Sequence, residues 1–161
     1  MFALVATLLY VTDQVTKYLA VEHLTGQPDR PLVGDLLQLH LTRNPGAAFS
    51  TGTAFTEVLT GIAIVAVGVV LWLSRRLGSR AWAVAMGLLL AGVGGNLTDR
   101  MLREPGPFRG HVIDFLMLPH WPIFNVADMC INVAAGLVLV QAFRGVRLDG
   151  SRVKPEGHGD D

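Results

Sequence analysis

The stretch V-L-T-G-I-A-I-V-A-V-G-V-V-L-W-L at residues 58–73 decides the fold class, because it carries no charged side chain over its whole length. Its residues are apolar on every side of a helix, so the segment lacks the polar stripe that a helix in water needs. With a few polar residues tolerated at its ends it reaches about 20 residues, the length that crosses a ~30 Å hydrocarbon core. The sequence therefore predicts a membrane-spanning helix near 55–73.

Three further stretches are free of charged side chains, at residues 1–12, 81–98 and 129–143. Extended by a few polar residues at their ends, they predict helices near 1–20, 81–98 and 124–143. The expected fold class is an all-α membrane protein with four transmembrane helices. A soluble bundle of unusually apolar helices and a cleaved secretory signal at 1–12 are the alternatives. The second alternative lacks a basic region before the apolar run and a small-x-small cleavage site after it.

These helices divide the chain into a membrane domain at 1–143, with external loops at 21–54 and 99–123, and a polar tail at 144–161. The tail contains Gly, Pro and acidic residues, so we expect it to be disordered. Within the third helix, Gly87, Ala91 and Gly95 recur at steps of four. Such a stripe of small residues predicts the close approach of a neighbouring helix.

The composition excludes several classes of protein. The 161 residues include 13 basic and 13 acidic side chains, so the formal net charge is zero and only 16% of the residues are charged. Nucleic-acid binding needs a surplus of Lys and Arg, which this chain lacks, so no nucleic-acid partner is expected. The single cysteine, Cys130, rules out a disulfide framework within the chain. It lies inside the fourth predicted helix without a lipobox, so it is not a site of lipid attachment.

Basic residues in short connections predict the orientation in the membrane. The segments between the second and third helices and after the fourth helix carry Arg75, Arg76, Arg80, Arg144, Arg147, Arg152 and Lys154. Short basic loops stay in the cytoplasm, so both termini are expected to be cytoplasmic. Arg100, Arg103 and Arg109 in the loop after the third helix make this asymmetry modest.

Charged and amide side chains near the external ends of the helices are the candidate functional residues, because charge in or near a membrane is costly. Asp13 and Lys17 lie four residues apart on one helix face and can form either a simple ion pair or a support for a site. Asn96, Asp99 and Arg100 lie within one turn of the third helix. The planar guanidinium of Arg100 there suggests a structural clamp on a carboxylate or carbonyl.

Two runs in the external loops resemble strands. Leu37, Leu39 and Leu41 alternate with polar residues, which predicts a short half-buried strand at 37–42. This run leads into N-P-G at 44–46, where Pro and Gly predict a turn. A second run at 111–118 contains Asp114 between apolar neighbours.

Asp114 and Asp128 are the candidate catalytic pair. Asp128 follows Asn125 by three residues at the start of the fourth helix, so the two side chains share a face. Two carboxylates that meet in a poorly solvated place share one proton, and such a pair can hydrolyse a peptide bond through an activated water. The spacing alone equally allows each carboxylate to pair separately with Arg100 or another basic group.

A metal site and a transport function are the alternatives to this catalytic pair. His111 lies three residues before Asp114, but no His-x-x-x-His pair or third ligand accompanies it, so neither a metal nor another cofactor is expected. A small proton-coupled transporter is the alternative function. Its carboxylates are expected near the middle of the membrane, whereas the acidic residues here map to the external ends.

Five short motifs occur in a characteristic order: D-Q-V-T-K at 13–17, N-P-G-A-A-F at 44–49, G-N-L-T-D-R at 95–100, V-I-D-F at 112–115 and F-N-V-A-D at 124–128. Together they closely resemble the bacterial lipoprotein signal peptidases, or signal peptidase II, over residues 1–143. Members of this family usually have a few residues before the first helix, whereas this chain starts at Met1-Phe2-Ala3. We therefore expect a late-starting first helix or a shortened chain, with a membrane span still possible.

The resemblance implies a monomeric aspartic endopeptidase of the bacterial inner membrane, with membrane lipids around it and its active site near the outer face. Its substrate would be a diacylglyceryl-modified prolipoprotein, cut just before the lipidated cysteine. The family's catalytic aspartates fall on Asp114 and Asp128. Its supporting polar residues fall on Asp13, Lys17, Asn44, Asn96, Asp99, Arg100 and Asn125. The runs at 37–42 and 101–111 resemble the family's small external sheet and mobile external segment.

Overall fold

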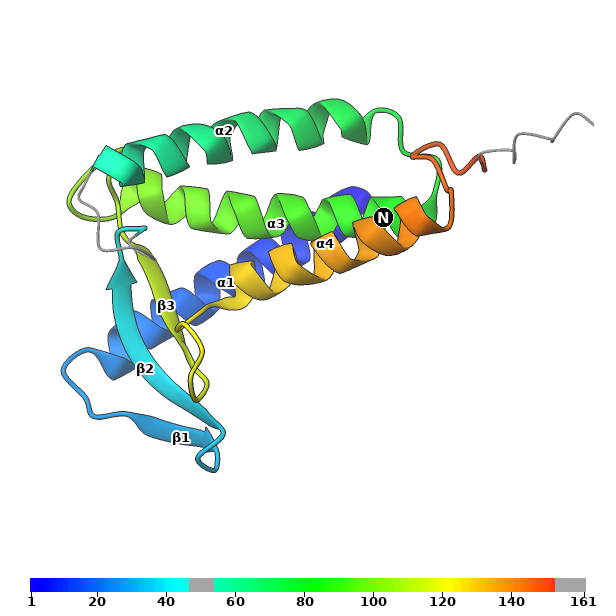
Figure 1. The fold of residues 1–161 in the computed structure, drawn as a ribbon. Coiled ribbons are helices and arrows are strands. Elements are labelled where there is room, and N and C mark those ends of the chain that lie inside the picture. The colour runs from blue at the N-terminus through cyan, green and yellow to red at the C-terminus, as the bar shows by residue number, and fades with distance from the viewer. Residues whose placement is uncertain (47–53, 153–161) are drawn as a thin grey trace, which may run out of the picture.

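The computed structural model describes residues 1–46 and 54–152 and contains four helices and three strands (Figure 1). In chain order they are α1 (Phe2–Leu24), β1 (Arg30–Val33), β2 (Leu37–Asn44), α2 (Ala54–Ser74), α3 (Arg80–Leu102), β3 (Val112–Met117) and α4 (Val126–Phe143).

The four predicted helices are all present, and α1 and α3 each run four residues further than the sequence predicted. Three of them, α2, α3 and α4, are long and apolar enough to cross a membrane. The helix α1 has a comparable length but carries Asp13, Lys17 and Glu22, which lower its hydropathy. The described part of the chain thus confirms the helical fold and three candidate spans.

The helix α3 lies at the centre of the bundle and packs against α1, α2 and α4, while α1 and α4 also contact each other (Figure 1). Small residues permit this packing. A Cβ atom on Gly87 would lie 2.9 Å from the carbonyl oxygen of Phe2 in α1, and one on Gly92 would lie 2.5 Å from that of Ala127 in α4. The predicted small-residue stripe therefore faces α1, and Gly92 extends the close packing to α4.

The three strands form an antiparallel sheet in the order β1-β2-β3, at the end of the bundle where α1 and α3 end (Figure 1). The predicted strands at 37–42 and 111–118 are confirmed as β2 and β3, whereas β1 was not predicted. Ile113 and Phe115 of β3 pack on Ala20 and Leu24 of α1 in a buried apolar cluster. This cluster fixes the sheet on the helices and leaves the neighbouring Asp114 at the junction.

The start of the polar tail is ordered, contrary to the expectation of disorder from residue 144. Val146 pairs with Arg152, and the N–H of Arg147 donates to the carbonyl oxygen of Ser151 at 2.8 Å. The carbonyl oxygen of Leu148 accepts hydrogen bonds from the connection between α2 and α3. Polar composition predicted disorder, but these backbone hydrogen bonds hold residues 144–152 in a turn. The rest of the predicted tail, 153–161, lies outside the described residues.

Candidate active site

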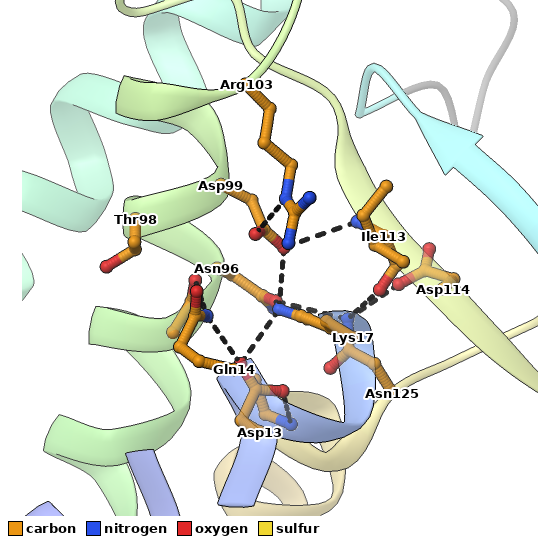
Figure 2. A network of polar contacts seen from close by, with 12 residues as sticks. Asp13, Gln14, Lys17, Asn96, Thr98, Asp99, Arg103, Ile113, Asp114 and Asn125 are labelled. Carbon is orange, nitrogen blue, oxygen red and sulfur yellow. Dashed lines mark hydrogen bonds and ion pairs between the residues drawn. The ribbon is translucent and has the colours of Figure 1, made fainter. Parts of the chain in front are cut away.

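Polar side chains from α1, α3, β3 and the start of α4 meet where the sheet joins the helices (Figure 2), and Asn44 of β2 joins them through Asp114. Eight of the nine predicted site residues are joined by hydrogen bonds or ion pairs: Asp13, Lys17, Asn44, Asn96, Asp99, Asp114, Asn125 and Asp128. They come from positions as far apart in the chain as Asp13 and Asp128. The fold thus assembles the motifs into one connected network.

Asp114 of β3 is almost completely buried and holds two amide donors. Its Oδ2 accepts a hydrogen bond of 2.9 Å from Asn44 Nδ2, and its Oδ1 accepts one of 2.6 Å from Asn125 Nδ2. Burial and, to a lesser degree, the nearby charge of Asp128 raise the pKa of Asp114 to about 6, although the two amides and Lys17 lower it. Asp114 therefore exchanges its proton close to neutral pH.

Asp128 lies in the first turn of α4, which begins with a capping box. The N–H of Asp128 donates to Asn125 Oδ1 at 2.9 Å, and Asp128 Oδ2 accepts from the N–H of Asn125 at 3.2 Å. Asn96 Nδ2 donates to the other oxygen, Oδ1, at 2.9 Å. Asn125 therefore contacts Asp114 through its side chain and Asp128 through its backbone, which brings the two carboxylates to one place.

Lys17 joins the first motif to the third in a buried ion network. Its Nζ lies 3.0 Å from Asp13 Oδ2, 2.8 Å from Asp99 Oδ2 and 2.8 Å from Asn96 Oδ1 (Figure 2). Asn96 Oδ1 also accepts from Asn125 Nδ2, so the Asn96 amide can direct its nitrogen only toward Asp128. The predicted Asp13–Lys17 ion pair is confirmed, and it is part of the support around the candidate pair.

Asp13 connects α1 to the start of α4. Its Oδ1 accepts a hydrogen bond of 2.8 Å from the N–H of Ala127, next to Asp128. A Cβ atom on Gly95 would overlap Asp13 Oδ2, so any larger residue where α3 passes this carboxylate would displace it. Sequence reasoning missed Gln14, whose Nε2 donates to Asp13 Oδ2 at 3.0 Å and to the carbonyl oxygen of Gly95 at 3.2 Å.

Asp99 is clamped by Arg103, an arginine that the sequence analysis did not single out. Arg103 Nε lies 2.5 Å from Asp99 Oδ1, whereas Arg100 makes no ion pair within the described ranges. A spacing of four places Arg103 on the same helix face as Asp99, while Arg100 is turned by about 100°. This spacing was a signal in the sequence that could have identified Arg103. Arg100 Nη1 is buried and has no hydrogen-bond partner among the residues described.

The N-P-G turn holds Asn44 in position. Asn44 Oδ1 accepts a 2.8 Å hydrogen bond from the N–H of Gly46, whose φ of 99° favours glycine. The amide nitrogen of Asn44 is thereby directed toward Asp114. Thr56 at the start of α2, which the sequence analysis missed, donates to the carbonyl oxygen of Pro45. The remaining motif residues, 47–49, lie outside the described residues.

The second external segment is tied to α2 as well. Thr60 Oγ1 donates a 2.9 Å hydrogen bond to the carbonyl oxygen of Phe108, and Arg109 forms an exposed ion pair with Glu57. The buried Thr60 was also missed, because a threonine in an apolar helix gives no distinctive sequence pattern. These contacts place the start of α2 against the loop that follows α3.

The donors around the two carboxylates are all neutral within the described part of the chain: the side-chain amides of Asn44, Asn96 and Asn125 and one backbone N–H. No group of three or more His, Cys, Asp and Glu residues in the described ranges is placed to hold a metal ion. Two carboxylates held by neutral donors can bind and activate a water molecule between them.

Comparison with known proteins gives the family. A family model described as signal peptidase (SPase) II matches residues 5–144. The chain is 48% identical over 158 residues to the lipoprotein signal peptidase of Leifsonia xyli subsp. xyli, covering 98% of this chain and 73% of that protein. It is 49% identical over 146 residues to the enzyme of the same name from Mycobacterium avium, covering 90% and 80% of the two chains.

Solved structures agree in fold. One described as a bacterial membrane enzyme superposes with a TM-score of 0.79 at 26% identity and covers 89% of this chain and 92% of its own. A second structure with a similar description, at 24% identity, has a TM-score of 0.76 and supports the fold alone. Because the family model matches most of the chain and the curated relatives agree with it, the chain belongs to the signal peptidase II family of aspartic peptidases.

Proposed function

We propose that this protein removes signal peptides from lipid-modified prolipoproteins, using Asp114 and Asp128 as the catalytic pair. The relatives are named lipoprotein signal peptidases, which supplies the substrate class. The observation that carries the chemistry is the contact of Asn125 with both carboxylates, at 2.6 Å through its side chain and 3.2 Å through its backbone. This contact makes one site of two residues that lie on different elements.

The reaction needs only the two carboxylates and one water molecule. The ionised carboxylate takes a proton from the water as it attacks the scissile carbonyl carbon, and the protonated carboxylate donates to the carbonyl oxygen. When the tetrahedral intermediate collapses, the carbon–nitrogen bond breaks, the leaving nitrogen receives the proton of the protonated carboxylate, and one hydroxyl of the intermediate returns its proton to the ionised carboxylate as the carbonyl reforms. The pair then returns to its starting state with one shared proton, so no cofactor is consumed.

The structure favours Asp114 as the member that holds the shared proton. Its burial and its pKa near 6 suit a group that must lose and regain a proton close to neutral pH. Asp128 is half-buried, and Asn96 and the backbone of Asn125 hold both of its oxygens. The pair still titrates as a unit, so kinetics report the behaviour of both groups together.

We infer that all four helices cross the bacterial inner membrane, with the sheet on the outer side and both termini in the cytoplasm. In α1, the charged Asp13 and Lys17 are completely buried against α3 and α4, so these two side chains contact protein and would not face lipid. The signal helix and acyl chains of the substrate would lie in the bilayer beside the enzyme, with the scissile bond at the outer interface. Because one chain supplies every contact of the pair, a monomer suffices.

The alternative of a proton-coupled transporter has no support. A proton relay requires ionisable groups through the thickness of the membrane. The sequence is free of charged residues at 1–12, 58–73, 81–98 and 129–143, so in the half of the bundle away from the sheet the helices carry one charged residue, Arg80 at the start of α3.

The decisive test is cleavage of a diacylated prolipoprotein by the purified protein in detergent micelles. Asp114→Asn and Asp128→Asn preserve shape but remove the titratable group, so each should lower kcat by about 10²–10⁴-fold, the usual range for general acid–base catalysis. The matched control is Asp29→Asn, at an exposed aspartate that pairs with His40 near the sheet's far edge. Substantial cleavage by either dyad variant would refute the assignment, and ion flux without a peptide product would favour the transporter.

A further inference from the structure

The end of the molecule opposite the sheet carries a concentration of arginines. Three lie at the α2–α3 connection and three in and around the turn that follows α4: Arg75, Arg76, Arg80, Arg144, Arg147 and Arg152. All six are exposed, and none of them forms a salt bridge with a residue that the structure describes. This end is also far from the candidate active site (Figure 1).

The turn after α4 is docked on the α2–α3 connection by specific hydrogen bonds. The N–H groups of Gly78 and Ser79 donate to the carbonyl oxygen of Leu148 at 3.0 and 3.2 Å. Trp82 Nε1 donates to the carbonyl oxygen of Val146 at 2.9 Å. A Cβ atom on Gly78 would overlap the carbonyl group of Asp149, so the docking depends on glycine at this position. The docked turn brings its arginines beside those of the connection.

The charge at this end is strongly positive within the described residues. Asp149 is the one acidic side chain there, and its carboxylate accepts hydrogen bonds from the N–H of Ser151 at 2.9 Å and from its hydroxyl at 2.7 Å. Six arginines thus face solvent around a single aspartate that is engaged within its own turn. Such a surface attracts anions.

Exposed apolar residues border this arginine surface. In the last turns of α2 and α4, Trp72 is 53% exposed and Phe143 is 89% exposed, and the Arg76 guanidinium lies 4.6 Å from the centre of the Trp72 ring. Aromatic residues next to arginines mark the level of lipid headgroups at the edge of a membrane span. A ligand here would meet both acyl chains and cationic groups.

We propose that the docked turn and the α2–α3 connection together form a binding site for an anionic phospholipid headgroup of the cytoplasmic leaflet. The lipid phosphate would lie among the arginines of the two segments, with its acyl chains along α2 and α4. The proposal rests on the membrane orientation in the proposed function and concerns a surface that the cleavage reaction does not use. The bound lipid would hold the tail turn on the bundle.

The binding test uses the purified full chain, stripped of lipid in a neutral detergent. Phosphatidylglycerol or phosphatidylcholine is titrated into it, and retained lipid is measured by native mass spectrometry. We expect selective retention of phosphatidylglycerol. In the double variant Arg147→Gln/Arg152→Gln this retention should fall about 25-fold, at roughly fivefold per arginine. The matched control Arg30→Gln/Arg43→Gln removes the same charge from exposed strand positions and should leave retention unchanged.

Gly78→Ala separates a built site from simple charge attraction, because it keeps every arginine but blocks the docking of the turn. It should abolish most of the selectivity for phosphatidylglycerol. If Gly78→Ala does not fold, the same measurement is made on Trp82→Phe, which removes only the indole N–H that donates to Val146. Three results would overturn the proposal. The parent could retain the two lipids equally, or the variant with an undocked turn could keep the parent's selectivity. Inorganic phosphate could also displace bound phosphatidylglycerol as well as added phosphatidylglycerol does. None of these readouts depends on cleavage.

Discussion

Replacing Lys17 with methionine should strongly destabilise the protein, because it removes the cation at the centre of the buried network. Lys17 Nζ lies 3.0 Å from Asp13 Oδ2 and 2.8 Å from Asp99 Oδ2, and all three side chains are at most 1% exposed. In the variant Asp99 keeps its ion pair with Arg103. Asp13 keeps only neutral donors, so a buried carboxylate loses its one cationic partner among the described residues.

Breaking a buried ion pair by removing one partner costs about 3–5 kcal/mol. For a chain of this size each kcal/mol lowers the midpoint of thermal unfolding by about 2–4 °C, so Lys17→Met should lower it by roughly 6–20 °C. The double variant Lys17→Met/Asp13→Asn removes the unpaired charge as well and should recover at least half of this loss. Its recovery would come from the charge rather than from packing, since Asn has nearly the shape of Asp.

The assay is thermal unfolding in detergent micelles, followed by intrinsic tryptophan fluorescence. The matched control is Arg109→Met, which breaks an ion pair with Glu57 between exposed side chains and should cost less than about 1 kcal/mol. If Lys17→Met unfolds within 2 °C of the parent, or if the double variant is less stable than the single one, the buried network does not stabilise the fold as argued.

Three further predictions concern the site. The raised pKa of Asp114 means that its ionisation opposes folding, so the free energy of unfolding should fall by about 2 kcal/mol as pH rises from about 4 to about 6. Denaturant titrations across this range should show the decline, and Asp114→Asn should flatten it. Asn44→Ala removes an amide that favours the charged form of Asp114, so the upper limb of the pH profile of kcat/KM should move to higher pH; an unchanged or lower limb would contradict this role. Gly95→Ala should destabilise the protein because its Cβ overlaps Asp13, whereas the neighbouring Gly94→Ala, whose Cβ meets nothing closer than 4.0 Å, should be neutral or slightly stabilising in thermal unfolding.

The helices could be predicted from the sequence because their charge-free stretches are long and need no partner to be recognised. The strands β2 and β3 were found from alternation and from an apolar run around Asp114. The strand β1, R-P-L-V at residues 30–33, was missed because four residues are too short for a periodic pattern. Order in the tail at 144–152 was missed because it depends on backbone hydrogen bonds to Gly78 and Ser79, far away in the chain.

The candidate site was predicted as a set of residues but not as a set of contacts. Local spacing identified the Asp13–Lys17 pair and the shared face of Asn125 and Asp128. It could not show that Lys17 reaches Asn96, 79 residues later, because helix packing sets that contact. The ion pair of Asp99 with Arg103 was missed because it depends on which helix face each arginine occupies.

The structure separates two kinds of buried acid by the charge of their partners. Asp13 and Asp99 are held by the cations Lys17 and Arg103 and join α1, α3 and the start of α4. Asp114 and Asp128 accept hydrogen bonds only from amides and a backbone N–H in the described part of the chain. A cation in contact would hold a carboxylate ionised and unable to carry a proton. Neutral donors fix its position and leave its proton exchangeable, as the pKa of Asp114 near 6 indicates. The network therefore places its cations where the helices must be fixed. The amide of Asn96 stands between Lys17 and Asp128, so no cation contacts a carboxylate that must exchange a proton in the described part of the chain.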